Sequence, residues 1–103
     1  IIGMGKISRL VVKKVSGFEM NILASDPYVT QADVADLSVT MVSSEEVYRQ
    51  SDFVIVHTSL FPSTFHLVSA EQLSMMKPTA CLINAARGAI VDEAALIDAL
   101  RAL

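Results

Sequence analysis

Apolar runs without polar alternation recur along this chain, and each is separated from the next by a segment with helical spacing. Phe53–Val56 (FVIV) and Ala80–Asn84 (ACLIN) are the clearest of these runs. Strands of this kind are buried on both faces, so they belong to a parallel sheet with helices above and below. Apolar residues make up 52% of the 103 residues, which suits one small domain or a part of a larger one. The sequence therefore predicts an α/β fold.

The helical segments carry their own start and stop signals. The first has its apolar residues on one stripe, at Ile7, Leu10, Val11 and Val15, and Gly17 is placed to end it. Ser43, Ser69 and Asp92 occupy N-cap positions of later helices, the first of which runs to about Gln50. Residues 29–37 fit either a loop or a short helix. Strands are predicted at Ile1–Gly5, Asn21–Ser25, Val39–Val42, Phe53–Val56 and Ala80–Asn84.

Strands connected in this way form a Rossmann-like doubly wound parallel sheet with the spatial order 3-2-1-4-5. The topological switch point then lies between the first and fourth strands, and ligands bind there at the carboxyl ends of the strands. Segments 3–8, 57–64 and 84–88 meet at this point, with Asp26 beside them at the end of the second strand. Only two residues precede Gly3, so we expect the sheet to be incomplete at both ends.

The segment IIGMGKIS has nearly the G-x-G-x-x-G spacing of a dinucleotide-binding turn, with Ser8 at the third glycine position. Gly3 permits the tight turn, and Gly5 lets the backbone approach phosphates. The amides of Lys6 and Ile7 lie at a helix start, where the helix dipole favours anions. The same pattern also fits a tight turn that binds nothing.

Asp26 strengthens the dinucleotide interpretation, because it lies 18 residues after Ser8 at the end of a second strand. Its carboxylate would accept hydrogen bonds from the adenosine ribose and repel the 2′-phosphate of NADP. We expect Ser8 to shift the helix slightly outward, with its hydroxyl bonded back to a helix carbonyl, and not to abolish the site.

Two further stretches place chemically useful side chains at the same edge. HTSLFPST offers the hydroxyls of Thr58, Ser59 and Thr64 for a cofactor's ribose or phosphate, although an ordinary capped loop has the same composition. Arg87 directly follows a strand end, where it would bind a carboxylate through two hydrogen bonds and polarise an adjacent carbonyl. The alternative is a surface arginine paired with Asp92 or Glu93.

Composition excludes several other classes of function. The net charge is -3 with mixed signs, so no basic run points to nucleic acid or to an anionic membrane. The single Cys81 excludes an internal disulfide and a cysteine-built metal site, and no metal is expected. A lone thiol favours a reducing, cytoplasmic location. No apolar stretch approaches the roughly 20 residues of a membrane span.

Several motifs in order resemble one family, the D-isomer-specific 2-hydroxyacid dehydrogenases, over the whole chain. GMGKIS is similar to the family's GxGxIG, and GFEMNILASDPY to its GFGM-V-AYDPY. SDFVIVHTSLFPSTFHLV resembles its SDFV-LH-PLTPET--LI, and LINAARGAIVDEAALIDAL its LINTARG--VDE-AL--AL. HTSLFPST is most similar to the phosphoglycerate dehydrogenases and their near relatives.

The resemblance implies hydride transfer between NAD and a 2-hydroxy acid or its 2-oxo partner. It implies that Arg87 binds and polarises the substrate, and that residues 1–103 form part of an NAD-binding domain, with the substrate domain absent. It also implies a homodimer for the full-length protein. The residues implied at or near the cofactor are Lys6, Ile7, Asp26, Thr58, Thr64, Ala85, Ala86 and Arg87.

The family's catalytic histidine and its supporting glutamate lie beyond the matched motifs, and neither His57 nor His66 matches that histidine. We therefore expect this segment alone to be inactive. A corepressor of the same fold that responds to NAD(H) is the main alternative, because such proteins keep the arginine. Another Rossmann protein, such as a methyltransferase, is disfavoured by the RG-VDE-AL stretch. Motifs in this segment do not identify the particular 2-hydroxy acid.

Overall fold

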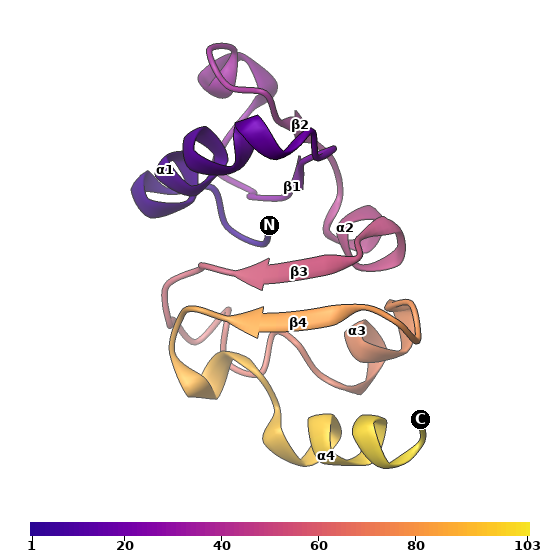
Figure 1. The fold of residues 1–103 in the computed structure, drawn as a ribbon. Coiled ribbons are helices and arrows are strands. Elements are labelled where there is room, and N and C mark those ends of the chain that lie inside the picture. The colour runs from indigo at the N-terminus through magenta and orange to yellow at the C-terminus, as the bar shows by residue number, and fades with distance from the viewer.

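Parallel pairing on both sides of Ile2 organises the fold in a computed structural model that describes residues 1–103. β1 (Leu23–Ala24) pairs with β2 (Thr40–Met41), and β3 (Phe53–Val56) pairs with β4 (Cys81–Asn84). Ile2 joins the two pairs, because it forms parallel bridges to Ser25 and to Val56. The order across the sheet is therefore β2, β1, Ile2, β3, β4 (Figure 1). This confirms the predicted order 3-2-1-4-5, with the first strand reduced to one bridging residue.

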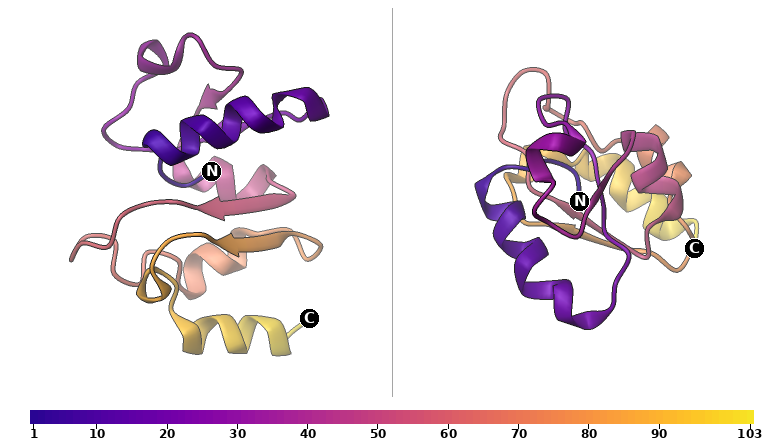
Figure 2. Two further views of the ribbon diagram at one scale, coloured as in Figure 1. Left: turned by 60° about the vertical axis from the view of Figure 1, so that its left-hand side comes forward. Right: turned by 90° about the horizontal axis from the view of Figure 1, so that it is seen from above.

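Helices lie on both faces of this sheet, as the views in Figure 2 show. α1 covers one face, and α2, α3 and α4 lie together on the other. None of these helices has the length and apolar character needed to cross a membrane. Their bounds are α1 (Lys6–Val15), α2 (Ser44–Gln50), α3 (Ala70–Met75) and α4 (Glu93–Arg101), with 3-10 turns η1 (Ser16–Phe18), η2 (Gln31–Val34) and η3 (Gly88–Ile90).

The predicted caps are confirmed. The Ser43 side chain accepts from the Glu46 amide at 3.2 Å, and Asp92 accepts from the Ala95 amide at 3.2 Å. Ser69 forms a capping box at the start of α3. The ambiguous segment 29–37 contains the short 3-10 turn η2. These caps succeed as predictions because they depend on neighbours three residues away and not on the tertiary fold.

The first predicted helix is confirmed as α1 and ends just before Gly17, but two of its details were not foreseen. Its buried side chains are Ser8 and Val12, whereas Ile7 and Leu10 of the predicted stripe are 58% and 48% exposed. The helix is rotated so that its small serine faces the glycine turn. Gly17 does not end the helix in a left-handed conformation; α1 passes into η1, and Glu19 takes the left-handed backbone with φ 55°.

Two apolar clusters hold the layers together. The larger one joins α2 to β3 through Val47, Tyr48, Val54 and Val56. The smaller one packs Val12 of α1 against Met4 and Ala24. On the α1 side the β3–β4 part of the sheet stays partly open, with Phe53 52% and Ile83 45% exposed. The glycine turn thus sits between the two clusters, where Ile2 connects them.

The Tyr48 hydroxyl yields a prediction about stability. It is buried without a hydrogen-bond partner, and burial raises the pKa of Tyr48 to about 12. Tyr48→Phe removes the orphan hydroxyl, so at pH 7 the free energy of unfolding should be unchanged or higher by about 1 kcal/mol.

The unfolded tyrosine ionises near pH 10, below the folded one, so ionisation draws the wild-type protein toward the unfolded state as pH rises from about 10 to 12. Tyr48→Phe should lose that part of the alkaline destabilisation. Urea unfolding at pH 7 and at about pH 10.5 measures both effects, and a variant weakened by more than about 1 kcal/mol at pH 7 would contradict this account.

Candidate functional site

Backbone hydrogen bonds bring the carboxyl ends of the strands to one edge. The Gly3 amide donates to Ser25 O at 2.8 Å, and the His57 amide donates to Ile2 O at 2.9 Å. On the far side, the Ala85 amide donates to Val56 O at 3.1 Å. The three segments and Asp26 that the sequence assigned to a switch point are therefore adjacent in the structure.

Gly3 is required by both its conformation and its surroundings. Its φ of +93° is unfavourable for any residue with a Cβ. A Cβ built there would also lie 2.9 Å from the Thr58 amide nitrogen, which is backbone and has no room to move. Gly5 differs, because nothing lies within 4 Å of its built Cβ and its φ is -85°. Gly5 therefore leaves an open surface at the start of α1.

The N-terminus of α1 is available to an anion. Gly5, the N-cap residue, supplies no side-chain cap, and the first turn contains no acidic residue. The amides of Lys6 and Ile7 have no acceptor within the chain, and both residues are exposed. Because the positive end of the helix dipole points the same way, this turn has the properties of a phosphate site.

Asp26 is fixed by two backbone amides, one on each oxygen. The Met4 amide donates to Oδ2 at 2.8 Å, and the Tyr28 amide donates to Oδ1 at 2.9 Å. A carboxylate has about four lone-pair sites, so about two remain for a ligand. The acidic residue and the glycine turn thus form one hydrogen-bonded unit. Sequence spacing predicted their proximity but not the Met4 amide that joins them.

Ser8 fits at the third glycine position without exposing its hydroxyl. The residue is 1% exposed, and its Oγ donates to Gly3 O at 2.7 Å. The predicted bond to a carbonyl within the helix is therefore wrong. Because the rotated helix directs Ser8 at the turn, the carbonyl within reach is that of Gly3.

The loop after β3 uses most of its polar groups internally. Thr64 Oγ1 accepts from the Phe61 amide at 2.7 Å and donates to Ser59 O at 2.6 Å. Thr64 therefore shapes the loop, whereas Thr58 contacts the glycine turn and the Ser59 side chain is exposed. Burial lowers the pKa of the His57 imidazole, so the ring is neutral at neutral pH.

Asn84 was not among the predicted site residues, yet it fixes the turn after β4. Its Oδ1 accepts from the Ala86 amide at 3.0 Å, and its Nδ2 donates to Arg87 O at 3.2 Å. An asparagine at a strand end is a common former of such turns, and this was the signal available in the sequence. The turn leaves Ala85 exposed and Ala86 half-buried.

Arg87 has an exposed side chain with no hydrogen bond or ion pair inside the chain. Asp92, one of its two predicted alternative partners, instead caps α4 and lies 3.7 Å from His66 Nδ1. Glu93, the other, forms no ion pair. The guanidinium therefore has no partner within residues 1–103.

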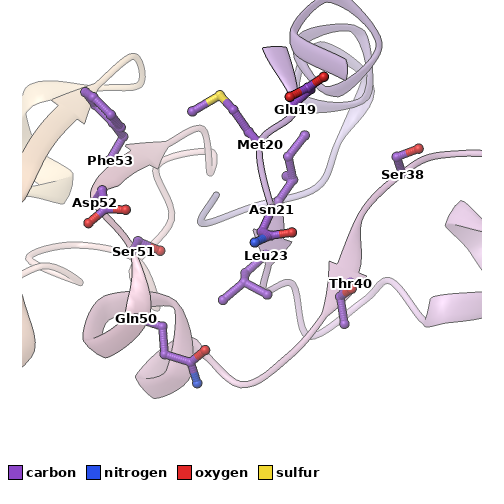
Figure 3. Close-up of a pocket in the computed structure, with 11 residues that line it drawn as sticks. Glu19, Met20, Asn21, Leu23, Ser38, Thr40, Gln50, Ser51, Asp52 and Phe53 are labelled. Atoms are coloured by element: carbon purple, nitrogen blue, oxygen red, sulfur yellow. The ribbon is translucent and has the colours of Figure 1, made fainter. Parts of the chain in front are cut away.

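A large cavity lies elsewhere. It measures about 800 Å³ and is lined by residues at the amino ends of the strands, including Asn21, Thr40 and Asp52 (Figure 3). In a parallel sheet of this kind ligands bind at the opposite edge. Its lining combines scattered polar groups with Met20, Leu23 and Phe53, and it has no helix N-terminus or glycine turn. Chemistry therefore favours the carboxyl edge over this cavity.

Comparison with known proteins agrees with this geometry. The family model "D-isomer specific 2-hydroxyacid dehydrogenase, NAD binding domain" matches residues 1–102. The chain accordingly belongs to this family of NAD-binding domains. The sheet, the glycine turn and Asp26 thus lie in an NAD-binding domain of this family.

Three proteins similar to this chain show which enzymes the family contains. The D-3-phosphoglycerate dehydrogenase of Methanocaldococcus jannaschii is 38% identical over 102 residues, which are 98% of this chain and 20% of that protein. A glyoxylate reductase of Korarchaeum cryptofilum is 41% identical, over 98% of this chain and 30% of the relative. The NAD complex of the Lactobacillus delbrueckii D-isomer specific 2-hydroxyacid dehydrogenase superposes with a TM-score of 0.90 at 37% identity, again over 98% of this chain and 30% of that one.

The chain thus spans about a fifth to a third of the length of these relatives. All three are dehydrogenases or reductases, and they lend no support to the corepressor alternative.

The two glycines should respond differently to the same substitution. Gly3→Ala should damage both folding and NAD binding, because its Cβ meets the Thr58 backbone; the strain should cost at least about 2 kcal/mol of unfolding free energy. Gly5→Ala has open space, so its unfolding free energy should change by less than about 1 kcal/mol. The new Cβ of Gly5→Ala would instead keep phosphates away from the turn and weaken the binding of NAD.

Thermal unfolding and calorimetric titration of the two variants in the intact protein measure both properties. Equal loss of stability in the two variants, or full NAD affinity in Gly3→Ala, would be inconsistent with the structure of this turn.

Proposed function

We propose that this chain is the cofactor-binding part of an enzyme that transfers a hydride between NAD and a D-2-hydroxy acid or the corresponding 2-oxo acid. One observation carries the proposal: the helix start with free amides and the Asp26 carboxylate are joined by the Met4 hydrogen bond. This unit offers donors for a pyrophosphate and an acceptor for a ribose. Bound NAD would supply the hydride acceptor or donor.

The residues fit the cofactor in distinct roles. Gly3 and Gly5 keep the turn tight and free of side chains. The amides of Lys6 and Ile7 would donate to the pyrophosphate. Asp26 would accept from the adenosine ribose hydroxyls through its free lone pairs. The residues that would line the nicotinamide half lie in the segments after β3 and β4; they are Thr58, Ser59, Ala85, Ala86 and Arg87. Thr64 would act by holding this loop in shape.

Cofactor choice tests the proposal. Asp26 should make the intact protein prefer NAD to NADP, because the 2′-phosphate would approach a carboxylate already bonded to two amides. Calorimetric titration with both nucleotides should give at least about tenfold tighter binding of NAD, a difference of 1.4 kcal/mol. Equal or tighter binding of NADP would reject this role for Asp26.

Arg87 is the residue that we propose for the substrate. A 2-oxo acid offers a carboxylate and an adjacent carbonyl oxygen, which suit the planar guanidinium fork. The Asn84 side chain donates to the backbone carbonyl of Arg87 and fixes that backbone. No acidic residue of the chain pairs with the Arg87 side chain. The carbonyl oxygen gains negative charge during reduction, so Arg87 would stabilise the transition state more than the ground state.

Arg87→Ala in the full-length protein should therefore lower kcat/KM by about 10²–10³, the usual effect of losing one such donor. Arg87→Lys should recover little of this, because an ammonium group lacks the fork. NAD affinity should change little in both variants. Steady-state kinetics with a panel of 2-oxo acids measures the effect.

Arg101→Ala is the matched control, since that arginine is also exposed but lies in the last turn of α4. If Arg87→Ala kept most of its kcat/KM, the substrate role would be ruled out, and a surface function would be the better explanation.

We further propose that the full-length protein is a cytoplasmic homodimer that takes a small 2-hydroxy or 2-oxo acid as substrate. The family resemblance supports the dimer and the substrate class. The single exposed thiol, Cys81, is consistent with a reducing compartment.

A further inference from the structure

Ser8 and Asp26 bond to opposite ends of one peptide group. Ser8 Oγ donates to the carbonyl oxygen of Gly3 at 2.7 Å. The amide of Met4, which belongs to the same peptide group, donates to Asp26 Oδ2 at 2.8 Å. Ser8 belongs to α1 and Asp26 follows β1, and both side chains bond to this peptide.

We propose that Ser8 is a positioning residue that sets the NAD-over-NADP preference by orienting the Gly3–Met4 peptide toward Asp26. The proposal rests on the proposed function of Asp26 as the ribose carboxylate. Its basis is the chain of hydrogen bonds that runs from the Ser8 hydroxyl through the peptide to the carboxylate.

The peptide needs such an anchor because glycine precedes it. Gly3 has no Cβ to restrict rotation of the following peptide plane, and its φ of +93° lies in the region that glycine occupies freely. The Gly3 carbonyl has no hydrogen-bond partner other than Ser8 Oγ. Gly3 and Met4 are both buried, so without the hydroxyl this carbonyl would be left unsatisfied. Relieving that cost requires the peptide plane to rotate, which would turn the Met4 amide away from Asp26.

A misplaced Met4 amide would affect the two nucleotides in opposite senses. Asp26 would keep only the Tyr28 amide on Oδ1 and would be free to swing. A mobile carboxylate would bond the ribose hydroxyls less well, which lowers the affinity for NAD. It would also move away from the 2′-phosphate more easily, which raises the affinity for NADP. A turn that was merely loosened would instead weaken both nucleotides alike, because both carry the same pyrophosphate. The ratio of the two dissociation constants therefore separates positioning from general structural damage.

The test uses the intact protein and titrates NAD and NADP into wild type, Ser8→Ala and Ser8→Gly. Both variants lack the hydroxyl, and Ser8→Gly, the smaller of the two, keeps the test open if Ser8→Ala folds poorly. We expect the ratio of Kd for NADP to Kd for NAD to fall about three- to tenfold in each, the range for one lost hydrogen bond. The amide proton of Met4 should move upfield in the ¹H–¹⁵N spectrum without nucleotide.

Ser16→Ala is the matched control, because Ser16 Oγ also donates to a backbone carbonyl, Lys13 O at 2.8 Å, but at the other end of α1. It should leave the ratio unchanged. In the background of Asp26→Ala, Ser8→Ala should produce no further fall, since the carboxylate that it positions is gone.

An unchanged ratio, an equal loss of affinity for both nucleotides, or additive effects of Ser8→Ala and Asp26→Ala would each overturn the positioning role. None of these outcomes would reject the proposed function of Asp26. Wild-type protein without an NAD preference would instead reject the proposed function of Asp26, and the positioning role with it.

Discussion

The backbone around Ile2, from Ile1 to Gly3, is the connection on which the rest of this structure depends. The Ile2 amide donates to Ile55 O at 2.8 Å, and the Ile2 carbonyl accepts from the His57 amide. On the other side, the Ser25 amide donates to Ile1 O at 3.0 Å. These bonds turn two separate strand pairs into one parallel sheet. They also fix the register in which Gly3, Asp26 and Thr58 reach the same edge, so the sheet and the site have a common cause.

The close approach of the glycine turn to the backbone after β3 explains why particular residue types are needed at this edge. Gly3 lies against the Thr58 backbone, so it has to be a glycine with positive φ. The same turn directs the Met4 amide at Asp26 and the Gly3 carbonyl at Ser8. The result is a helix start with free amides beside an acceptor of fixed orientation. The anion binding and ribose binding that we propose would thus arise from one turn and not from two independent features.

Much of the fold could be predicted from the sequence. Apolar runs such as FVIV, the caps at Ser43 and Asp92, and the strand order depend on local pattern and on general rules of chain connection. The rotation of α1 could not be predicted, because Ile7 and Val12 are equally apolar and only packing decides which of them is buried. The spacing of Asp26 after the glycine turn, in contrast, was sufficient to predict that this residue lies beside the turn.

The hydrogen-bond partners of Asp26, Ser8 and Asn84 required coordinates, since they depend on backbone groups that every sequence contains. A motif can place such a residue at an edge of the sheet. It does not show which amide or carbonyl faces that residue.

NAD binding at the carboxyl edge is tested most directly by titrating the intact protein with NAD and following the backbone amide shifts in ¹H–¹⁵N spectra. We expect the largest shifts on the amides of residues 3–8, on Asp26 and on Thr58, at the carboxyl edge of the sheet. Shifts concentrated instead on Asn21, Thr40 and Asp52, around the 800 Å³ cavity at the opposite edge, would contradict it.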